Sequence, residues 1–305
     1  LLLRSVCLLL GVLMRRVGNP PATLAPSLNW WVIQIALPAM VLELIPRLHL
    51  DPNLWYLVIS QWLVFLGAFL LCRFLGRRLG WSNGRIGALT LVCGLGNTSF
   101  MGYPMLEALR GPEQLALGVV ADQLGCFVML SLGGVLVGVI YAGQAATPVA
   151  VAKRVLLFPA FVCLIIGLLV GQLGGWPSEV DSVLHRLAQS LAPLALFSVG
   201  LRLKLQLARH QWLPVGVALS WKMALAPVVM WSLGSALGVS GAILSIAVLQ
   251  AAMAPMISAA ILAEQFHLEP ELANAVLGIG IYELAKALVT MPDVVAKIDE
   301  WLRVV

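Results

Sequence analysis

The fold is decided by the stretch Gly94-Leu95-Gly96-Asn97-Thr98-Ser99-Phe100-Met101-Gly102-Tyr103-Pro104, in which three glycines and a polar triplet interrupt an apolar run. Pro104 lacks an amide donor and clashes with the preceding turn of a helix. Inside a bilayer, such an interruption is tolerated only where protein or a water-filled cavity surrounds it. The stretch therefore predicts a broken membrane helix that serves a binding site, and an ordinary proline kink is the simpler alternative.

The composition of the whole chain places this stretch in a membrane. Hydrophobic residues make up 61% of the 305 residues and charged residues only 11%, and the mean hydropathy is +0.97. A soluble domain carries about 25% charged residues, so this chain has too little polar surface for water. The net charge of +5 bears on orientation in the membrane and not on nucleic acid. We expect the lipid bilayer as a partner and no nucleic acid.

Ten segments are apolar enough to cross a bilayer as helices, which takes about 20 residues. The linkers between them are short and rich in Gly, Pro and Asn, which favour turns. The first segment is short, and we interpret it as a span that lacks its first residues. The expected spans cover about 1–14, 27–46, 54–72, 85–109, 113–140, 153–173, 183–203, 211–237, 241–264 and 271–292.

Short matches between the two halves of the chain indicate an internal repeat. Chance similarity between apolar helices explains any one match, but four matches share a separation of 155 to 157 residues. Each half holds five spans, an odd number, so the second half enters the membrane upside down. Inverted repeats of this kind are typical of transporters and place the substrate site near the midplane. We predict repeats at 1–145 and 146–305. The matched segments are 6–11 with 162–167, 37–39 with 192–194, 106–108 with 262–264 and 115–116 with 272–273.

A second interruption lies in the repeat mate of the first broken span, at Gln250-Ala251-Ala252-Met253-Ala254-Pro255-Met256-Ile257-Ser258. Interrupted spans at matching positions of two halves point to a transport site. The N-termini of half-helices carry about +0.5 charge and free N–H groups, which suit an anion. We predict that the substrate is bound by Asn97, Thr98, Ser99, Tyr103, Pro104, Gln250, Met253, Pro255 and Ser258.

These residues resemble the auxin efflux carrier family, the group that includes the plant PIN carriers. Residues 95–105 are similar to the family's N-T-x-x-x-G-x-P-L segment, and residues 250–266 to its second crossover, which ends in A-[KE]-x-[YF]. Residues 222–227 are similar to its Lys-x4-Pro, and residues 37–39 to its Leu-Pro-Ala. The resemblance covers nearly the whole chain. The chain departs from the plant pattern at Gly96, where plant members have Pro, and it lacks their long cytoplasmic loop.

The resemblance implies ten helices with both termini outside and crossing broken helices in spans 4 and 9. It also implies that spans 1, 2, 6 and 7 form a scaffold, and that spans 3–5 and 8–10 form a moving transport domain. Bacterial relatives are associated with malate- or malonate-like carboxylates and plant relatives with auxin, which is also a carboxylate. The implied substrate is therefore a small organic anion.

Five polar residues inside the expected spans are candidates for coupling. A charge at mid-bilayer costs at least about 2.5–3.5 kcal/mol, so each needs a partner or a path for water. Lys222 either attracts the substrate carboxylate or snorkels to an interface. Asp122, beside Gln123, either carries a proton or is held by a hydrogen bond to a neighbouring Ser or to backbone. Glu283 and Lys286, three residues apart, either form a buried structural pair or make Glu283 titrate during transport.

Basic residues predict the orientation of the chain. With ten spans, the loops on one face hold eleven Lys and Arg residues and the loops on the other face hold six. The richer face is expected in the cytoplasm. We therefore expect a multi-pass protein of the cytoplasmic or plasma membrane with both termini outside.

The sequence carries no enzyme signature. Its four His are scattered and its five Cys have neither CxxC nor metal-ligand spacing. No P-loop is present, which excludes ATP-driven transport within this chain. We therefore expect no enzyme activity, no metal and no cofactor.

Together these patterns predict an all-α integral membrane protein with ten transmembrane helices in two inverted five-helix repeats. The predicted function is a secondary transporter that moves a small organic anion, a carboxylate, by alternating access. The alternative is a membrane sensor or receptor that keeps the fold and no longer transports, and a third class is an ion channel. A homodimer, and coupling to protons or sodium, remain open.

Overall fold

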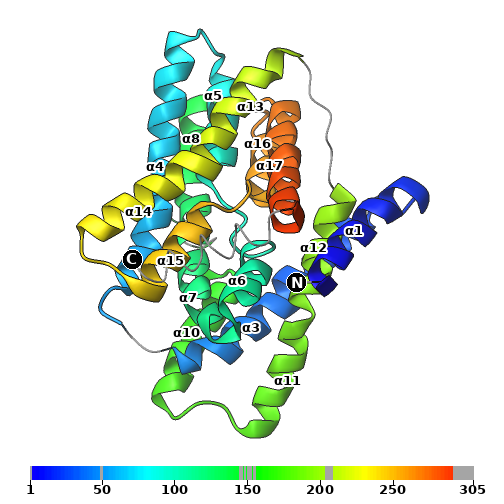
Figure 1. The fold of residues 1–305 in the computed structure, drawn as a ribbon, viewed down its shortest axis with the longest axis vertical. Coiled ribbons are helices and arrows are strands. Elements are labelled where there is room, and N and C mark those ends of the chain that lie inside the picture. Colours follow the sequence, from blue (N-terminus) through cyan, green and yellow to red (C-terminus); the bar gives the residue numbers. More distant parts are fainter. Residues whose placement is uncertain are drawn as a thin grey trace. The chain divides into compact units, whose positions relative to one another are not determined.

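In the computed structural model, the regular secondary structure of the described residues is all helical, apart from one isolated antiparallel bridge. It describes residues 2–48, 51–143, 147, 149, 153, 156–202 and 209–290. The predicted repeat boundary at 145–146 and both ends of the chain lie outside these residues. The chain divides into two compact units, which Figure 1 draws as ribbons and which are described one at a time.

Four stretches of the described chain are long and apolar enough to cross a membrane, and two shorter helices are also apolar. An integral membrane protein built from helices is therefore what the structure supports. The ten spans and the inverted repeat stay predictions, as do the scaffold and the transport domain. The four stretches are Leu24–Arg47, Leu54–Arg78, Pro112–Ala142 and Arg209–Ala236, and the shorter helices are Pro159–Gln172 and Gly241–Ala251.

Unit 1 comprises Leu1–Asp51, Ser99–Val119 and Arg154–Leu203. Small residues let its helices approach closely: a Cβ on Gly11 would lie 2.3 Å from the carbonyl oxygen of Phe197, and one on Gly167 would lie 3.0 Å from Ile45. The first contact brings α1 against α12, which lie side by side in Figure 1. The α-helices of unit 1 are α1 (Leu2–Val17), α2 (Leu24–Trp31), α3 (Leu37–Leu44), α6 (Gly102–Arg110), α7 (Leu115–Val120, which ends at the unit boundary), α10 (Pro159–Gln172), α11 (Ser178–Gln189) and α12 (Leu191–Arg202).

Unit 2 comprises Pro52–Thr98, Val120–Lys153 and Lys204–Val305. Its core includes Phe65, because a Cβ on Gly94 would lie 2.8 Å and one on Gly133 2.5 Å from the ring of that residue. Three helices therefore meet around one aromatic ring. The α-helices of unit 2 are α4 (Leu54–Arg78), α5 (Asn83–Gly94), α8 (Val128–Ala142), α13 (Trp212–Ser220), α14 (Ala226–Ala236), α15 (Gly241–Ala251), α16 (Ile257–Gln265) and α17 (Pro270–Thr290).

Three π-helical segments interrupt the long helices, at Val32–Ala36, Ala121–Phe127 and Trp221–Leu225. Two of them end two residues before a proline, Pro38 or Pro227. Proline cannot donate to the carbonyl of the preceding turn, and a π-helical turn is a common way to absorb the missing bond. π-Helical turns also occur often at functional sites, and the second and third segments carry Asp122 and Lys222.

Candidate functional site

The two interrupted segments meet within unit 2. α5 ends at Gly94 and α15 ends at Ala251. The Asn97 amide donates to the carbonyl oxygen of Ala254 at 2.7 Å, and the Met256 amide donates to that of Leu95 at 3.0 Å. Gly96 and Pro255 form the antiparallel bridge. We call this pairing of residues 95–97 with residues 254–256 the crossing. Each interruption supplies backbone partners that the other lacks, which meets the requirement for irregular backbone in a membrane.

The two prolines of the interruptions, Pro104 and Pro255, do not lie at the points where the helices break. Pro104 lies in the first turn of α6, where the missing amide donor costs little. Pro255 follows four residues after the end of α15. Both helices are broken as predicted, but the breaks begin at Leu95 and at Ala252. The sequence interpretation of Pro104 and Pro255 as the breaking residues is therefore corrected.

A hydrogen-bonded chain of buried side chains adjoins the crossing. The Thr98 hydroxyl donates to Oδ1 of Asp122, and Nε2 of Gln123 donates to Oδ2 of the same carboxylate at 2.7 Å. Nε2 of Gln250 donates to the carbonyl oxygen of Thr98 at 3.4 Å. The π-helical turn carries Asp122, which is 2% exposed, and Gln123, which is 1% exposed. The structure therefore gives Asp122 a hydroxyl partner, as one interpretation of the sequence expected, although from Thr and not Ser.

Lys222 lies beside the crossing and is completely buried. A Cβ on Gly96 would lie only 2.8 Å from Nζ of Lys222 and 3.3 Å from the carbonyl oxygen of Gln250. Glycine at position 96 therefore leaves the space that the ammonium group occupies. A snorkelling lysine would expose its ammonium group, and Lys222 does not. The sequence showed Gly96 only as a departure from the plant pattern, and its role here was missed.

The neighbouring tryptophan fixes the segment that carries Lys222. Nε1 of Trp221 donates to the carbonyl oxygen of Val64 on α4 at 3.2 Å. A Cβ on Gly67 would lie 2.3 Å from the Trp221 ring, so glycine lets the ring pack closely against α4. Because Trp221 faces α4 and Lys222 follows it directly, this anchor sets the direction of the lysine.

Three buried polar atoms around the crossing have no hydrogen-bond partner within the described part of the chain: Nζ of Lys222, Oε1 of Gln123 and Oε1 of Gln250. A buried polar group without a partner costs about 1–3 kcal/mol, and more when it is charged. Such a group in a folded protein calls for an explanation, and a ligand is one. The site thus offers a guest one hydrogen-bond donor, the ammonium group, and two acceptors, the amide oxygens.

The remaining predicted site residues are spread over both units. Ser99, Tyr103 and Pro104 belong to unit 1, where the Tyr103 amide donates to the carbonyl oxygen of Ser99 at 3.3 Å. In unit 2, the Met253 amide donates to the carbonyl oxygen of Gln250 at 3.3 Å. Ser258 lies in the first turn of α16 and is partly exposed.

Glu283 and Lys286 form the predicted ion pair on α17, with 3.8 Å between Nζ and Oε2. Their side chains are 46% and 51% exposed, so the pair is not buried within the described chain. The interpretation of these two residues as a buried structural pair is corrected on this point.

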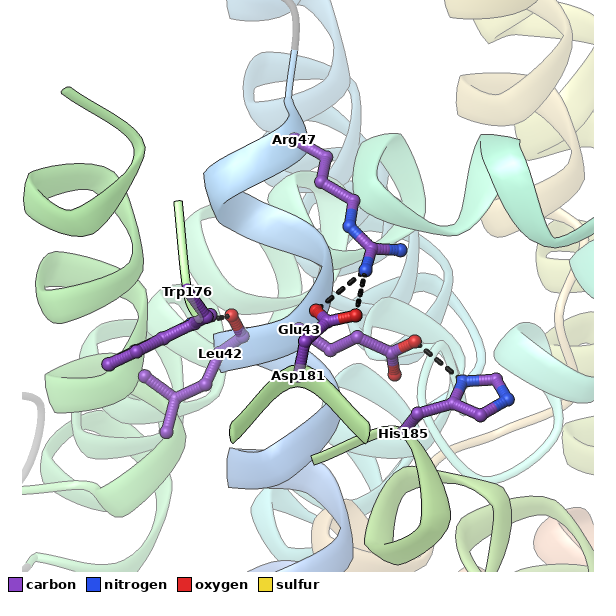
Figure 2. A network of polar contacts seen from close by, with 6 residues as sticks. All are labelled: Leu42, Glu43, Arg47, Trp176, Asp181 and His185. Carbon is purple, nitrogen blue, oxygen red and sulfur yellow. Dashed lines mark hydrogen bonds and ion pairs between the residues drawn. The ribbon is translucent and has the colours of Figure 1, made fainter. Parts of the chain in front are cut away.

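A second polar region, in unit 1, was not recognised from the sequence. Glu43 of α3 is only 7% exposed, and its Oε1 lies 2.7 Å from Nδ1 of His185 on α11. Nη2 of Arg47 donates to both carboxylate oxygens of Asp181 at 2.6 Å. Nε1 of Trp176 donates to the carbonyl oxygen of Leu42 at 2.8 Å. Figure 2 shows these contacts, which we call the α3–α11 network.

The α3–α11 network fastens two helices by pairing each of its charges. In the sequence, the four His residues are merely scattered along the chain. The partners are separated by 134 or 142 positions in the chain, so no local pattern could have shown them. Its groups are satisfied by one another, and the network therefore has the character of a structural element.

Comparison with known proteins gives the family. Residues 10–292 match the family described as "Membrane transport protein". An uncharacterized transporter of Methanothermobacter thermautotrophicus is 25% identical over 273 residues, which cover 88% of this chain and 89% of the relative. An uncharacterized transporter of Methanocaldococcus jannaschii is 24% identical over 277 residues, covering 88% of each chain. With its apolar helices and paired interruptions, this chain belongs to the membrane transport protein family, that of the auxin efflux carriers.

Proposed function

We propose that the chain is a secondary transporter that moves a small organic anion, a carboxylate, across the membrane by alternating access. Membership of a transport family gives the general class. The observation that carries the proposal of an anion is the ammonium group of Lys222, which is fully buried and has no hydrogen-bond partner in the described chain.

Charge complementarity supports a carboxylate as the guest. A buried charge is stable only when it is paired, and Lys222 has no such hydrogen-bonded anion among the described residues. A carboxylate that reached Nζ would accept a charge-assisted hydrogen bond, which is about twice as strong as a neutral one. The unpaired Oε1 atoms of Gln250 and Gln123 lie in the same unit and accept hydrogen bonds, so they suit a hydroxyl group of the guest and not its carboxylate. The predicted binding residues Asn97, Thr98, Met253 and Pro255 line or adjoin the crossing.

Coupling is assigned to the carboxylate of Asp122. Thr98 and Gln123 hold it next to the crossing, so a change in its protonation would alter the backbone segment that contacts Gln250. A proton carried by Asp122 would thereby be felt at the anion site. Glu283 and Lys286, exposed and paired on α17, are not needed for this scheme.

The test is uptake of labelled carboxylates into proteoliposomes. A panel of malonate, malate and an aromatic monocarboxylate covers one and two charges. We expect saturable uptake and counterflow, which a channel does not show. Lys222→Met keeps the length of the side chain and removes its charge, and we expect it to abolish uptake, while Lys153→Met, at an exposed lysine, leaves uptake unchanged. Wild-type uptake by a folded Lys222→Met protein would overturn the anion site.

The same preparations distinguish the sensor from the transporter. A ligand stabilises the folded state by RT ln(1 + [L]/Kd), so binding appears as a rise in melting temperature even without flux. A carboxylate that stabilises the protein but is neither taken up nor exchanged would identify a sensor and contradict the proposed transport.

A further inference from the structure

The hairpin of α4 and α5, two helices that lie side by side in Figure 1, carries arginines without a carboxylate partner in the described chain. Arg73, Arg77 and Arg78 lie in the last two turns of α4, and none of them forms an ion pair with a described residue. Arg85 in the first turn of α5 differs from them, because its Nε donates to Oε2 of Glu269 at 3.0 Å. Among the described residues, the end of α4 therefore keeps three positive charges that no carboxylate neutralises.

The same end of α4 borders an apolar stripe. Leu66, Leu70 and Phe74 are exposed and follow one another at intervals of four residues, so they lie along one face of the helix. Arg78 lies four residues further on this face, and its guanidinium carbon is 5.3 Å from the centre of the Phe74 ring. This contact holds the arginine over the end of the stripe. One face of α4 thus presents apolar surface that ends at a fixed positive charge.

The length of α5 places these arginines at the level of the lipid head groups. The 12 residues of α5 (Asn83–Gly94) lead from the hairpin to the crossing and cover about 18 Å at 1.5 Å per residue. The hydrocarbon core of a bilayer is about 30 Å thick, so its midplane, where the crossing is expected, lies about 15 Å from each surface. The end of α4 packs against the start of α5, since a Cβ on Gly76 would lie 2.4 Å from Ile86. The arginines therefore reach the depth of the lipid phosphates.

We propose that the end of α4 binds an anionic phospholipid, with the phosphate held by Arg77 and Arg78 and an acyl chain lying along Leu66, Leu70 and Phe74. The fork of N–H donors on a guanidinium group fits phosphate oxygens and forms charge-assisted hydrogen bonds with them. Phosphatidylcholine suits the site less well, because its choline group adds a positive charge next to the arginines. The proposal concerns the membrane and not the substrate, so it stands apart from the proposed function.

The experiment measures thermal unfolding of the purified chain in detergent micelles that contain either phosphatidylglycerol or phosphatidylcholine. We expect the wild type to melt at least about 3 °C higher with phosphatidylglycerol, because a ligand that binds only the folded state stabilises it. The double variant Arg77→Gln and Arg78→Gln is expected to lose most of this rise and to melt like the wild type in phosphatidylcholine. A full rise in the double variant, or no rise in the wild type, would overturn the proposal.

Arg85→Gln is the matched control for the single variant Arg78→Gln. Each variant loses one positive charge from the same hairpin, but Arg85 is already paired with Glu269. We expect Arg78→Gln to lower the rise caused by phosphatidylglycerol by about half, and Arg85→Gln to leave it within about 1 °C of the wild-type rise. Equal losses in the two variants would mean that the lipid responds to total charge, which contradicts a site at the end of α4. If the double variant does not fold, these single variants decide.

Glycerol phosphate distinguishes a bound lipid from a free phosphate. It carries the same phosphate charge without an acyl chain, so we expect it to cause no rise in phosphatidylcholine micelles at the concentration at which phosphatidylglycerol acts. A rise as large as that from phosphatidylglycerol would show that the apolar stripe takes no part, and it would overturn the lipid as the occupant. Melting needs no substrate, so absence of uptake would bear on the proposed function alone.

Discussion

The α3–α11 network of unit 1 and the crossing of unit 2 differ in how their charges are paired. In the network, Glu43 lies against His185, Arg47 against Asp181, and the other ring nitrogen of His185 is 2.9 Å from Nε2 of Gln189. At the crossing, Lys222 is more deeply buried than any of these and has no hydrogen-bond partner in the described chain. The paired charges of the network hold two helices together, whereas the ammonium group of Lys222, which has no hydrogen-bond partner in the described chain, is available to a ligand.

The two regions also differ in where their helices become irregular. Unit 1 ends its α3 with a short 3-10 turn (Ile45–Arg47), and the charges there lie near the surface. Unit 2 interrupts two helices inside its core and keeps the backbone satisfied by pairing the two segments. Changes at the crossing are therefore expected to alter transport, and changes in the network are expected to alter stability only.

The largest effect is expected from Gly96→Val, which puts a branched side chain against the ammonium group of Lys222, since even a Cβ there would lie 2.8 Å from Nζ. Uptake should fall at least about a hundredfold, equivalent to about 2.7 kcal/mol. Gly216→Ala on α13 is the matched control, because a Cβ there meets nothing within 4 Å. Uptake assays on both folded proteins decide the matter, and a transport-competent Gly96→Val protein would show that the ammonium group need not lie beside the crossing.

A smaller effect is expected from Thr98→Val, which removes the hydroxyl that donates to Asp122 and keeps the shape of the side chain. The carboxylate then retains one fewer donor, and we expect a loss of about 1–3 kcal/mol in the free energy of unfolding. Denaturant titration in detergent measures it.

Thr90→Val is the control for Thr98→Val. Thr90 is also fully buried, but its hydroxyl donates to the carbonyl oxygen of Ile86 in its own helix. That carbonyl belongs to the ladder of α5, so little should be lost. Equal losses in the two variants would mean that the bond to Asp122 contributes nothing particular.

In unit 1, Glu43→Gln keeps a hydrogen bond to His185 and removes the charge. Because half of the His185 side chain is exposed to solvent, we expect a loss of at most about 1 kcal/mol and unchanged uptake. Melting temperature and uptake are read on the same preparation. Loss of transport with a normal melting temperature would place Glu43 in the transport cycle and break the contrast between the two regions.

The smallest effect is expected from Arg47→Ala. The pair with Asp181 is short, but the side chains are 56% and 30% exposed. Solvent-exposed pairs contribute about 0–1 kcal/mol and are screened by salt. We expect a melting temperature within about 2 °C of the wild type, and a difference that shrinks in high salt. A larger loss would mean that this pair is a main fastening of α3 to α11.

Much of the fold could be predicted because it depends on local properties. Long apolar runs require a bilayer, and clusters of Gly, Asn and Pro interrupt helices wherever they occur. The positions of both interruptions were therefore predictable to within a few residues. The exact residue at which each helix breaks was not predictable. The prolines Pro104 and Pro255 are the residues that usually break a helix, but the helices end earlier, at Gly94 and Ala251.

The sequence named candidate residues but could not give their arrangement, and their part in substrate binding stays a prediction. Asn97, Thr98, Gln250 and Pro255 were named from the pattern, and they do adjoin one another. The sequence could not distinguish a snorkelling Lys222 from a buried one, because both interpretations are compatible with the same amino-acid sequence. It also gave Glu283 and Lys286 equal standing with Asp122, although their exposure differs widely.

The sequence by itself determined that this chain is a helical membrane protein with an interrupted helix in each half, since composition and backbone stereochemistry act over a few residues. Only the tertiary structure decided that the two interruptions pair at Gly96 and Pro255 and that Lys222 lies beside them. Those contacts join residues more than 100 positions apart. Whether a charge is stabilised by a partner, by helix ends or by water depends on such distant neighbours, and no local pattern records them.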